Sequence, residues 1–126
     1  MKVARLDHLV LTVNSIEVTS QFYSNVLGMD IVTFGEGRVA LTFGEQKINL
    51  HQLGNEFEPK AAQVKSGSAD LCFITHTPIN EVQSHIESQG VTIIDGPIQR
   101  TGSMGKIISV YLRDPDGNLI ELSNYL

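Results

Sequence analysis

Four residues of this chain have side chains that together could bind a metal ion. Glu121 stands in the segment LIELSNYL, inside a run that otherwise has the pattern of a buried strand. A carboxylate in such a run is costly unless it is paired or bound to a metal. His8, His51 and Asp70 also belong to residue types that coordinate divalent cations. Two neutral imidazoles and two carboxylates suit Zn, Ni, Co, Mn or Fe(II), and the two carboxylate charges offset those of a dication.

An internal repeat relates the segments that contain these residues. DHLVLTVNSIEVTSQFYSNVLGMDIV aligns without a gap with ADLCFITHTPINEVQSHIESQGVTII. His8 falls on Asp70 and Gly28 on Gly90, each pair 62 positions apart. A fixed offset of this kind predicts two copies of one structural unit.

Each copy is predicted to have the order β-α-β-β-β. An alternating strand pattern opens each copy, and a helical stripe follows that ends at Gly28 or Gly90, with Ser15 suited to the N-cap of the first helix. The later strands are predicted at MDIVTF, RVALTF and KINLHQL in the first copy and at VTIIDG, KIISVYL and NLIELSNY in the second. RDPDGN and GEQ are predicted to be the turns before the last strands. The polar stretch 55–68 is expected to link a first module at 1–54 to a second at 69–126.

Strand alternation puts the four candidate ligands on equivalent faces. In the opening strands His8 and Asp70 begin the row that points away from the helix. In the last strands the same count puts His51 and Glu121 on that face, and we interpret them as equivalent positions. The repeat therefore predicts two candidate ligands in each module.

Each candidate also has an ordinary structural explanation. A single histidine on a strand is more often hydrogen-bonded than bound to a metal. Asp70 could cap loop amides at the start of its strand, and Glu121 could pair with an arginine such as Arg113 or Arg5. Four candidates at matching places in a repeat favour the metal interpretation.

Composition excludes several other classes of protein. The chain has 126 residues, a length typical of one domain, and a net charge of −5, which leaves no basic surface for a nucleic acid. The single Cys72 cannot form an internal disulfide, and we expect a buried, unreactive thiol in a reducing compartment. No apolar run approaches the roughly 20 residues that span a bilayer, so a cytoplasmic protein without membrane partners is expected.

The motifs LDHLVLTV, INLHQL and YLRDPDGNLIELSN resemble those of the vicinal oxygen chelate superfamily over essentially the whole chain, and DPDGNLIEL is the most specific part. That superfamily includes glyoxalase I, fosfomycin-resistance and bleomycin-resistance proteins and extradiol dioxygenases. The chain is most similar to its small glyoxalase-domain-containing proteins. The resemblance implies an α+β fold in which two βαβββ modules form a cupped mixed sheet around a divalent metal. It also implies a homodimer in which modules of both chains meet.

The resemblance implies specific roles for the four candidate ligands. His8 matches the ligand that opens the first module, His51 takes the place of that module's last-strand ligand, and Glu121 matches the terminal glutamate, which is both ligand and catalytic base. Asp70 departs from the pattern, because glyoxalase I and the fosfomycin proteins ordinarily have histidine there. That departure implies weaker metal binding, a different metal or only three protein ligands.

The activity implied by the resemblance is that of a lactoylglutathione lyase-like enzyme. Its small-molecule substrate would be a hemithioacetal of an α-oxoaldehyde, formed with glutathione or another thiol. An anionic arm of the substrate would need positive charge, and the segment QRTGSMGK is a candidate flap that supplies Arg100 and Lys106, with Tyr111 on the next strand and Arg38 as a weaker candidate. A solvated loop is the alternative interpretation of that segment.

Two other functions stay open. One is a metal-free protein that sequesters a drug or metabolite, as bleomycin-resistance proteins do, although the retained candidate ligands argue against it. The other is a ring-cleaving dioxygenase, which also uses two histidines and one carboxylate on iron.

Overall fold

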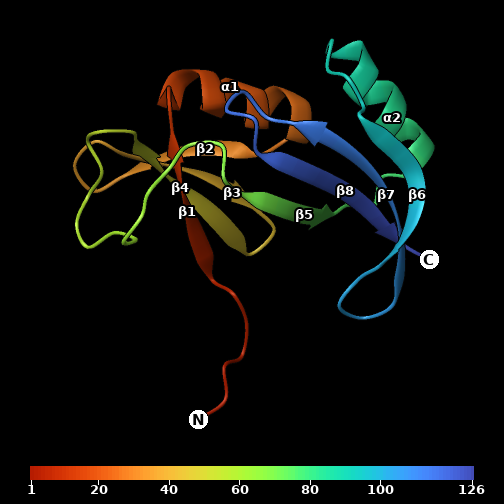
Figure 1. Ribbon diagram of the computed structural model, residues 1–126, viewed down its shortest axis with the longest axis horizontal. Coiled ribbons are helices and arrows are strands. Elements are labelled where there is room, and N and C mark those ends of the chain that lie inside the picture. Colours follow the sequence, from red (N-terminus) through yellow and green to blue (C-terminus); the bar gives the residue numbers. More distant parts are fainter. The chain divides into compact units, whose positions relative to one another are not determined.

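The computed structural model describes all 126 residues and divides the chain into two compact units. These are Met1–Ser66, called the first module below, and Gly67–Leu126, called the second module. The boundary between them falls inside the segment 55–68 that the sequence predicted to be a linker. Each module has the order β-α-β-β-β (Figure 1).

The first module contains one helix and a four-stranded mixed sheet. Its strand order is β1-β4-β3-β2, with β1 parallel to β4 and the other neighbours antiparallel. The elements are β1 (His8–Val13), α1 (Ile16–Leu27), β2 (Asp30–Phe34), β3 (Arg38–Phe43) and β4 (Gln46–Gln52).

The second module repeats this arrangement. Its strand order is β5-β8-β7-β6, again with one parallel pair, β5 and β8, and two antiparallel pairs. The elements are β5 (Asp70–Ile74), α2 (Ile79–Ser88), β6 (Asp95–Thr101), β7 (Lys106–Arg113) and β8 (Leu119–Tyr125). The predicted α+β class and the duplicated βαβββ order are confirmed.

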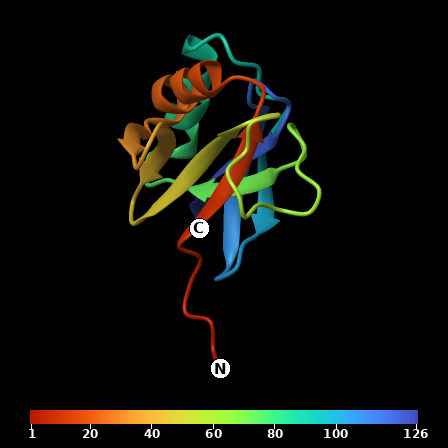
Figure 2. The same cartoon turned by 90° about the vertical axis from the view of Figure 1, so that its left-hand side faces the viewer.

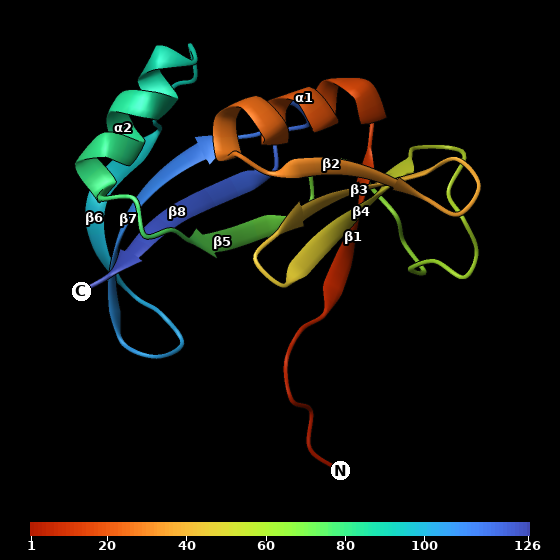
Figure 3. The ribbon, with the colours of Figure 1, turned by 180° about the vertical axis from the view of Figure 1, so that it is seen from behind.

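In each module the helix packs on one face of its own sheet. In Figures 2 and 3, α1 lies along the sheet of the first module while the N-terminal segment extends away from it. The cores consist of the apolar residues on the helix side, such as Tyr23 with Ile48 in the first module and Ile86 with Val110 in the second, all fully buried. Because strand residues alternate between faces, the candidate ligands are left on the face away from the helix.

The helix ends also follow the sequence. The Ser15 side chain accepts a hydrogen bond from the Val18 amide at 3.2 Å, which caps α1. Gly28 ends α1 with φ of +69°, and Gly90 follows α2 with φ of +74°. Both glycines therefore take the left-handed conformation that their positions after a helix predicted.

The strand predicted at VTIIDG begins later than the sequence indicated. Residues 91–94 are irregular and β6 begins at Asp95, because the Val91 amide bonds back to the Ile86 carbonyl at the end of α2 and so does not join the sheet. The register between β6 and β7 shifts between Asp95 and Ile98, which marks a bulge. Without that shift, alternation would put Asp95 and Arg100 on opposite faces.

The predicted linker is a packed part of the first module. The Glu56 carboxylate accepts hydrogen bonds from the Gly54 amide and from the Lys60 ammonium, the latter at 3.0 Å. The Phe57 ring packs edge-on against the His51 ring, 5.5 Å between centroids. In Figures 1 and 3 the yellow-green segment after β4 accordingly folds back beside its sheet.

Neither helix could cross a bilayer, because α1 has 12 residues and α2 has 10.

The bulge in β6 depends on Gly96. Its φ is +92°, and a Cβ at this position would collide with the carbonyl oxygen of Ser109 on β7. We predict that Gly96→Ala lowers the free energy of unfolding by about 3 kcal/mol or more, combining backbone strain with overpacking. Urea denaturation measures this loss.

Gly44→Ala is the matched control for that substitution. Gly44 also has positive φ, +52°, but nothing lies near its Cβ position, so only strain of about 1 kcal/mol is expected. If both variants lose the same free energy of unfolding, contact with Ser109 is not the reason that position 96 requires glycine.

Candidate functional site

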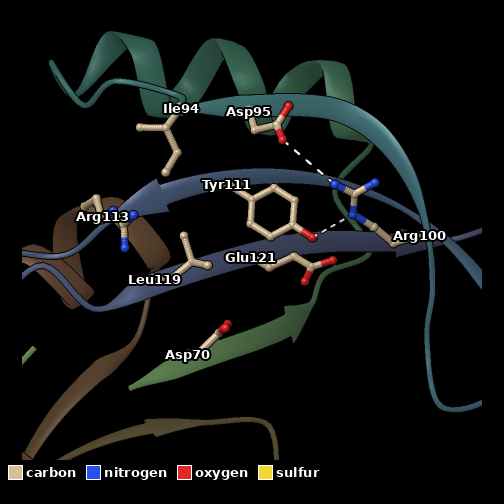
Figure 4. A pocket seen from close by; sticks show the side chains of 8 residues that line it. All are labelled: Asp70, Ile94, Asp95, Arg100, Tyr111, Arg113, Leu119 and Glu121. Atoms are coloured by element: carbon tan, nitrogen blue, oxygen red, sulfur yellow. Dashed lines mark hydrogen bonds and ion pairs between the residues drawn. The ribbon is translucent and has the colours of Figure 1, made fainter. Parts of the chain in front are cut away.

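The second module has a charged cavity on the face of its sheet away from α2. The cavity has a volume of about 460 Å³ (Figure 4). Its lining residues are Asp70, Ile94, Asp95, Arg100, Tyr111, Arg113, Leu119 and Glu121. A second cavity of about 410 Å³ shares Arg100, Tyr111 and Glu121 with the first and has apolar walls that include Ile74 and Ile107. Glu121 therefore borders both a charged and a partly apolar space.

Two buried hydroxyls orient the Glu121 carboxylate. Ser109 on β7 donates a hydrogen bond to Glu121 Oε2 at 2.5 Å, and Ser123 lies 3.4 Å from the same oxygen. The two serine hydroxyls are 2.7 Å apart, and neither residue is exposed to solvent. Hydrogen bonds to a charged acceptor are stronger than hydrogen bonds between neutral groups. These two bonds therefore explain why a carboxylate is tolerated in this strand.

Tyr111 and Arg100 form a second polar group beside Glu121. Arg100 Nε donates a hydrogen bond to Tyr111 Oη at 3.1 Å, and Arg100 Nη2 lies 3.9 Å from Asp95 Oδ2 (Figure 4). Burial of the Tyr111 hydroxyl, together with the neighbouring Glu121 carboxylate, raises the Tyr111 pKa, although Arg100 acts in the opposite direction. Tyr111 thus stays protonated at neutral pH and can donate a hydrogen bond.

Asp70 lies in the wall of the same cavity as Glu121. It is the first residue of β5 and pairs with Leu119, two residues before Glu121 on the adjacent β8. The preceding residue, Ala69, donates its amide to Asn118 Oδ1 at 2.8 Å, and this buried asparagine in turn bonds to Asp114. The predicted turn RDPDGN therefore fixes the starts of both strands that carry the carboxylates.

Cys72 is exposed, so the prediction of a buried thiol is wrong. It stands directly opposite Glu121 in the β5–β8 pair, on the cavity face. Its Sγ lies 3.4 Å from Ser123 Oγ. Partial desolvation, with the Glu121 and Asp70 charges, raises the Cys72 pKa, and this disfavours the reactive thiolate.

In the first module, His8 has the environment of an oriented ligand. Its Nδ1 lies 2.8 Å from the Asp7 carboxylate, and this hydrogen bond lowers the Asp7 pKa. A carboxylate on one ring nitrogen fixes the tautomer of a metal-binding histidine and directs the other nitrogen to the metal. The His8 side chain is 44% exposed.

His51 and Glu121 are not equivalent, which corrects the interpretation from the sequence. Val10 pairs with Asn49 and its repeat partner Cys72 pairs with Glu121, so Asn49 occupies the place of Glu121. By the same register His51 corresponds to Ser123. Counting alternation had identified the correct face of β4 but not the position along it.

The register also separates the two histidines of the first module. His8 pairs with Lys47, whereas His51 pairs with Thr12, four residues further along the strands. Four residues of a strand span about 13 Å between Cα atoms, and side chains on one face of a sheet stand roughly perpendicular to it, so the two imidazoles do not converge on one ion within the module. Within neither module do three His, Cys, Asp or Glu side chains gather around one point.

The predicted cationic residues lie in different places. Arg100 is on β6 rather than in a flap, and only residues 102–105 connect β6 to β7. Lys106 begins β7 on the face opposite Tyr111 and lines neither cavity, because alternate residues of a strand point to opposite sides. Arg38 lies on β3 in the first module, over the Phe34 ring.

Sequence reasoning missed Ser109, Ser123 and Asn49. The serines gave no signal because a buried serine on a strand is ordinary. Asn49 could have been found by aligning INL of the first module with IEL of the second, which brings the last strands into register.

The fold and these motifs define a family. A sequence model of the Glyoxalase/Bleomycin resistance protein/Dioxygenase superfamily matches residues 5–122, and the chain belongs to that superfamily.

Several relatives match over nearly the whole chain. A virulence protein of Salmonella typhimurium is 60% identical over all 126 residues, which cover 88% of that protein. A glyoxalase domain-containing protein of Mycosarcoma maydis is 54% identical over 99% of this chain and 70% of its own. The solved structure of an integron cassette protein from the mobile metagenome of V. cholerae is 64% identical, with a TM-score of 0.99, covering 100% of this chain and 98% of that one.

The coupling between Ser109 and Glu121 can be measured by a double-mutant cycle. Ser109→Ala should lower the free energy of unfolding by about 1–3 kcal/mol in the wild-type background, because a half-buried charged acceptor loses its donor. In a Glu121→Gln background the same change should cost less, since the acceptor is no longer charged. Ser109→Thr should preserve the hydroxyl, and Ser84→Ala on α2 is the control. Additive losses would contradict the proposed hydrogen-bonded pair.

Proposed function

We propose that this protein is a metal-dependent lyase or isomerase of glyoxalase type. Its substrate would be a small molecule with two neighbouring oxygens, such as a hemithioacetal of an α-oxoaldehyde. The observation that carries the proposal is the Glu121 carboxylate, oriented by two buried hydroxyls on the wall of a charged cavity. Superfamily membership and the glyoxalase domain-containing relative support it.

Three residues are proposed to hold one divalent ion. Glu121 and Asp70 offer carboxylates that line one cavity, and His8 offers an imidazole whose other nitrogen is already bonded to Asp7. The expected assembly is a homodimer in which modules of both chains meet and complete each site. Zn, Ni, Co, Mn and Fe all fit oxygen and imidazole donors.

The chain's own residues supply the proton chemistry. A dication held there would stabilise negative charge that develops on the two substrate oxygens. Glu121 would remove a proton from one carbon of the substrate and return it to the neighbouring carbon, while Ser109 and Ser123 hold the carboxylate in position. Protonated Tyr111 would donate a hydrogen bond to substrate, and Arg100 and Arg113 would attract an anionic arm.

The ligand set argues against a ring-cleaving dioxygenase. Such enzymes hold iron with two histidines and one carboxylate. Here the register separates His51 from His8, and the proposed set has one imidazole and two carboxylates. A binding protein that sequesters its ligand without chemistry is the remaining alternative.

Metal content and activity test the proposal together. Protein purified without added metal should contain about one divalent ion per chain, and it should convert methylglyoxal with glutathione. His8→Ala and Glu121→Gln should each lower metal affinity by at least about 10-fold and remove most of the activity, because each loses a ligand. Elemental analysis and a coupled assay measure these effects.

Two control variants sharpen this experiment. Glu45→Gln removes an exposed carboxylate in the β3–β4 turn and should change neither readout. His51→Ala should keep its metal, because His51 lies four residues along the sheet from His8 and is not one of the three proposed ligands. Protein that cannot be loaded with any divalent ion and does not convert the substrate would contradict the proposal and favour sequestration. Full activity in Glu121→Gln would contradict the role proposed for that carboxylate.

A further inference from the structure

The sheet face that carries Glu121 becomes less charged along its strands. At one end Asp70 and Arg113 line the charged cavity. Ile74 stands four residues beyond Asp70 on β5, and Tyr125 stands four residues beyond Glu121 on the parallel β8. Alternate residues of a strand share a face, so all these side chains belong to the cavity side of the sheet. Glu121 therefore lies between a charged end and an end with larger apolar side chains.

The second cavity occupies the less charged end. Its volume of about 410 Å³ is in the size range of sites that hold small molecules. Ile74, Ile107, Tyr111 and Tyr125 form part of its wall, and Glu121 lines it as well as the charged cavity. A molecule held at Glu121 can therefore extend into either space.

Arg100 is the only cation in the wall of this cavity, and its donors are directed at its own module. Its Nε donates to Tyr111 Oη at 3.1 Å, and its Nη1 donates to the Gln99 carbonyl at 3.4 Å. Its Nη2 lies 3.9 Å from the Asp95 carboxylate. Ile74, in contrast, is 46% exposed, and covering such apolar surface is favourable in water. This end of the sheet thus favours an apolar group of a ligand over a charged one.

Tyr125 fixes the turn that forms another part of the same wall. Residues 102–105 connect β6 to β7, and Gly102 and Ser103 line the cavity. The Met104 amide donates a hydrogen bond to Tyr125 Oη at 3.2 Å, and Ser103 Oγ lies 3.4 Å from the same oxygen. A Cβ on Gly102 would lie only 3.0 Å from this hydroxyl. The turn and the tyrosine are therefore packed directly against each other.

We propose that the second cavity binds an apolar substituent of the substrate, and that Tyr125 limits the length of this substituent by fixing the turn 102–105. This inference rests on the proposed function, in which Glu121 acts where the two neighbouring oxygens of the substrate are bound. The substrate class is accordingly a compound whose oxygen-bearing carbons carry a hydrocarbon group. Tyr125 acts on specificity through the turn and does not touch the reacting atoms.

Neutral diols test the cavity in metal-free protein. The 1,2-alkanediols have two neighbouring oxygens and an apolar tail, and they are titrated into chelator-treated protein in order of increasing length from propane-1,2-diol. Methyl NMR signals of Ile74 and Ile107 report binding locally and give the dissociation constants. Each added methylene should tighten binding about fourfold, as expected for burial of one methylene. Affinity should stop rising at the length at which the tail reaches the turn.

Two substitutions change the wall in opposite ways. Ile74→Trp fills part of the cavity and should weaken long-tailed diols about 10-fold or more, with propane-1,2-diol affected much less. Tyr125→Phe removes the acceptor of the Met104 amide, so the turn should loosen and affinity should keep rising with longer tails. Val18→Trp, at a 54% exposed position on α1 of the first module, is the control and should bind as the wild type does. Circular dichroism verifies that each variant is folded.

Three results would overturn the inference. One is an affinity that does not rise with tail length. Another is tighter binding of erythritol than of butane-1,2-diol, since these compounds have equally long carbon chains but erythritol has a polar tail. The third is an Ile74→Trp variant that binds long-tailed diols as tightly as the wild type does. An unchanged length limit in Tyr125→Phe would contradict the role of Tyr125.

Failure of this inference is distinguishable from failure of the proposed function. A protein without metal or activity that still shows the dependence on tail length would contradict the proposed enzyme and retain the cavity as a binding site. A protein that binds metal and converts the hemithioacetal, but shows no dependence on tail length, would contradict only the assignment of the cavity.

Discussion

The second module is organised around the hydrogen bonds that orient the Glu121 carboxylate. Glu121 is half-buried on the cavity face of β8, whereas its neighbours Ile120 and Leu122 are buried on the helix side. Ser109 on β7 and Ser123 on β8 direct their hydroxyls at one oxygen of this carboxylate. The register of β8 with its two neighbours also positions the Tyr111 hydroxyl and the Asp70 carboxylate, because Tyr111 pairs with Glu121 and Asp70 pairs with Leu119.

The two modules share one backbone arrangement but differ in the side chains on the face away from the helix. Gln52 and Asn124 occupy matching places at the ends of β4 and β8, and each donates its amide to the carbonyl of the segment before the helix. The architecture is thus preserved down to individual hydrogen bonds. At the polar face the modules differ, because Asn49 stands where the second module has Glu121, and His51 stands where it has Ser123. The first module consequently lacks a carboxylate at that position, and both Asn49 and His51 are buried.

Much of the fold could be predicted from the sequence because its signals are local. Strand alternation, the two helix-ending glycines and the turn RDPDGN each act within a few residues, and the repeat extends these local signals from one module to the other. The errors arose where a prediction required pairing between strands. Alternation assigns His51 to a face, but only the β1–β4 register shows that it lies four residues, about 13 Å, further along the sheet than His8. Likewise the bulge at Gly96, which puts Asp95 and Arg100 on one side, depends on contact with Ser109 in another strand.

The central claim is that Glu121 is a metal ligand oriented by buried hydroxyls. Crystals grown with Mn or Zn, measured at the absorption edge of the metal, test it most directly. The account predicts one anomalous peak about 2.0–2.2 Å from a Glu121 carboxylate oxygen and from Nε2 of a His8 in the crystal. An anomalous peak at His51 with none at Glu121, or no peak at either residue in metal-saturated crystals, would contradict it.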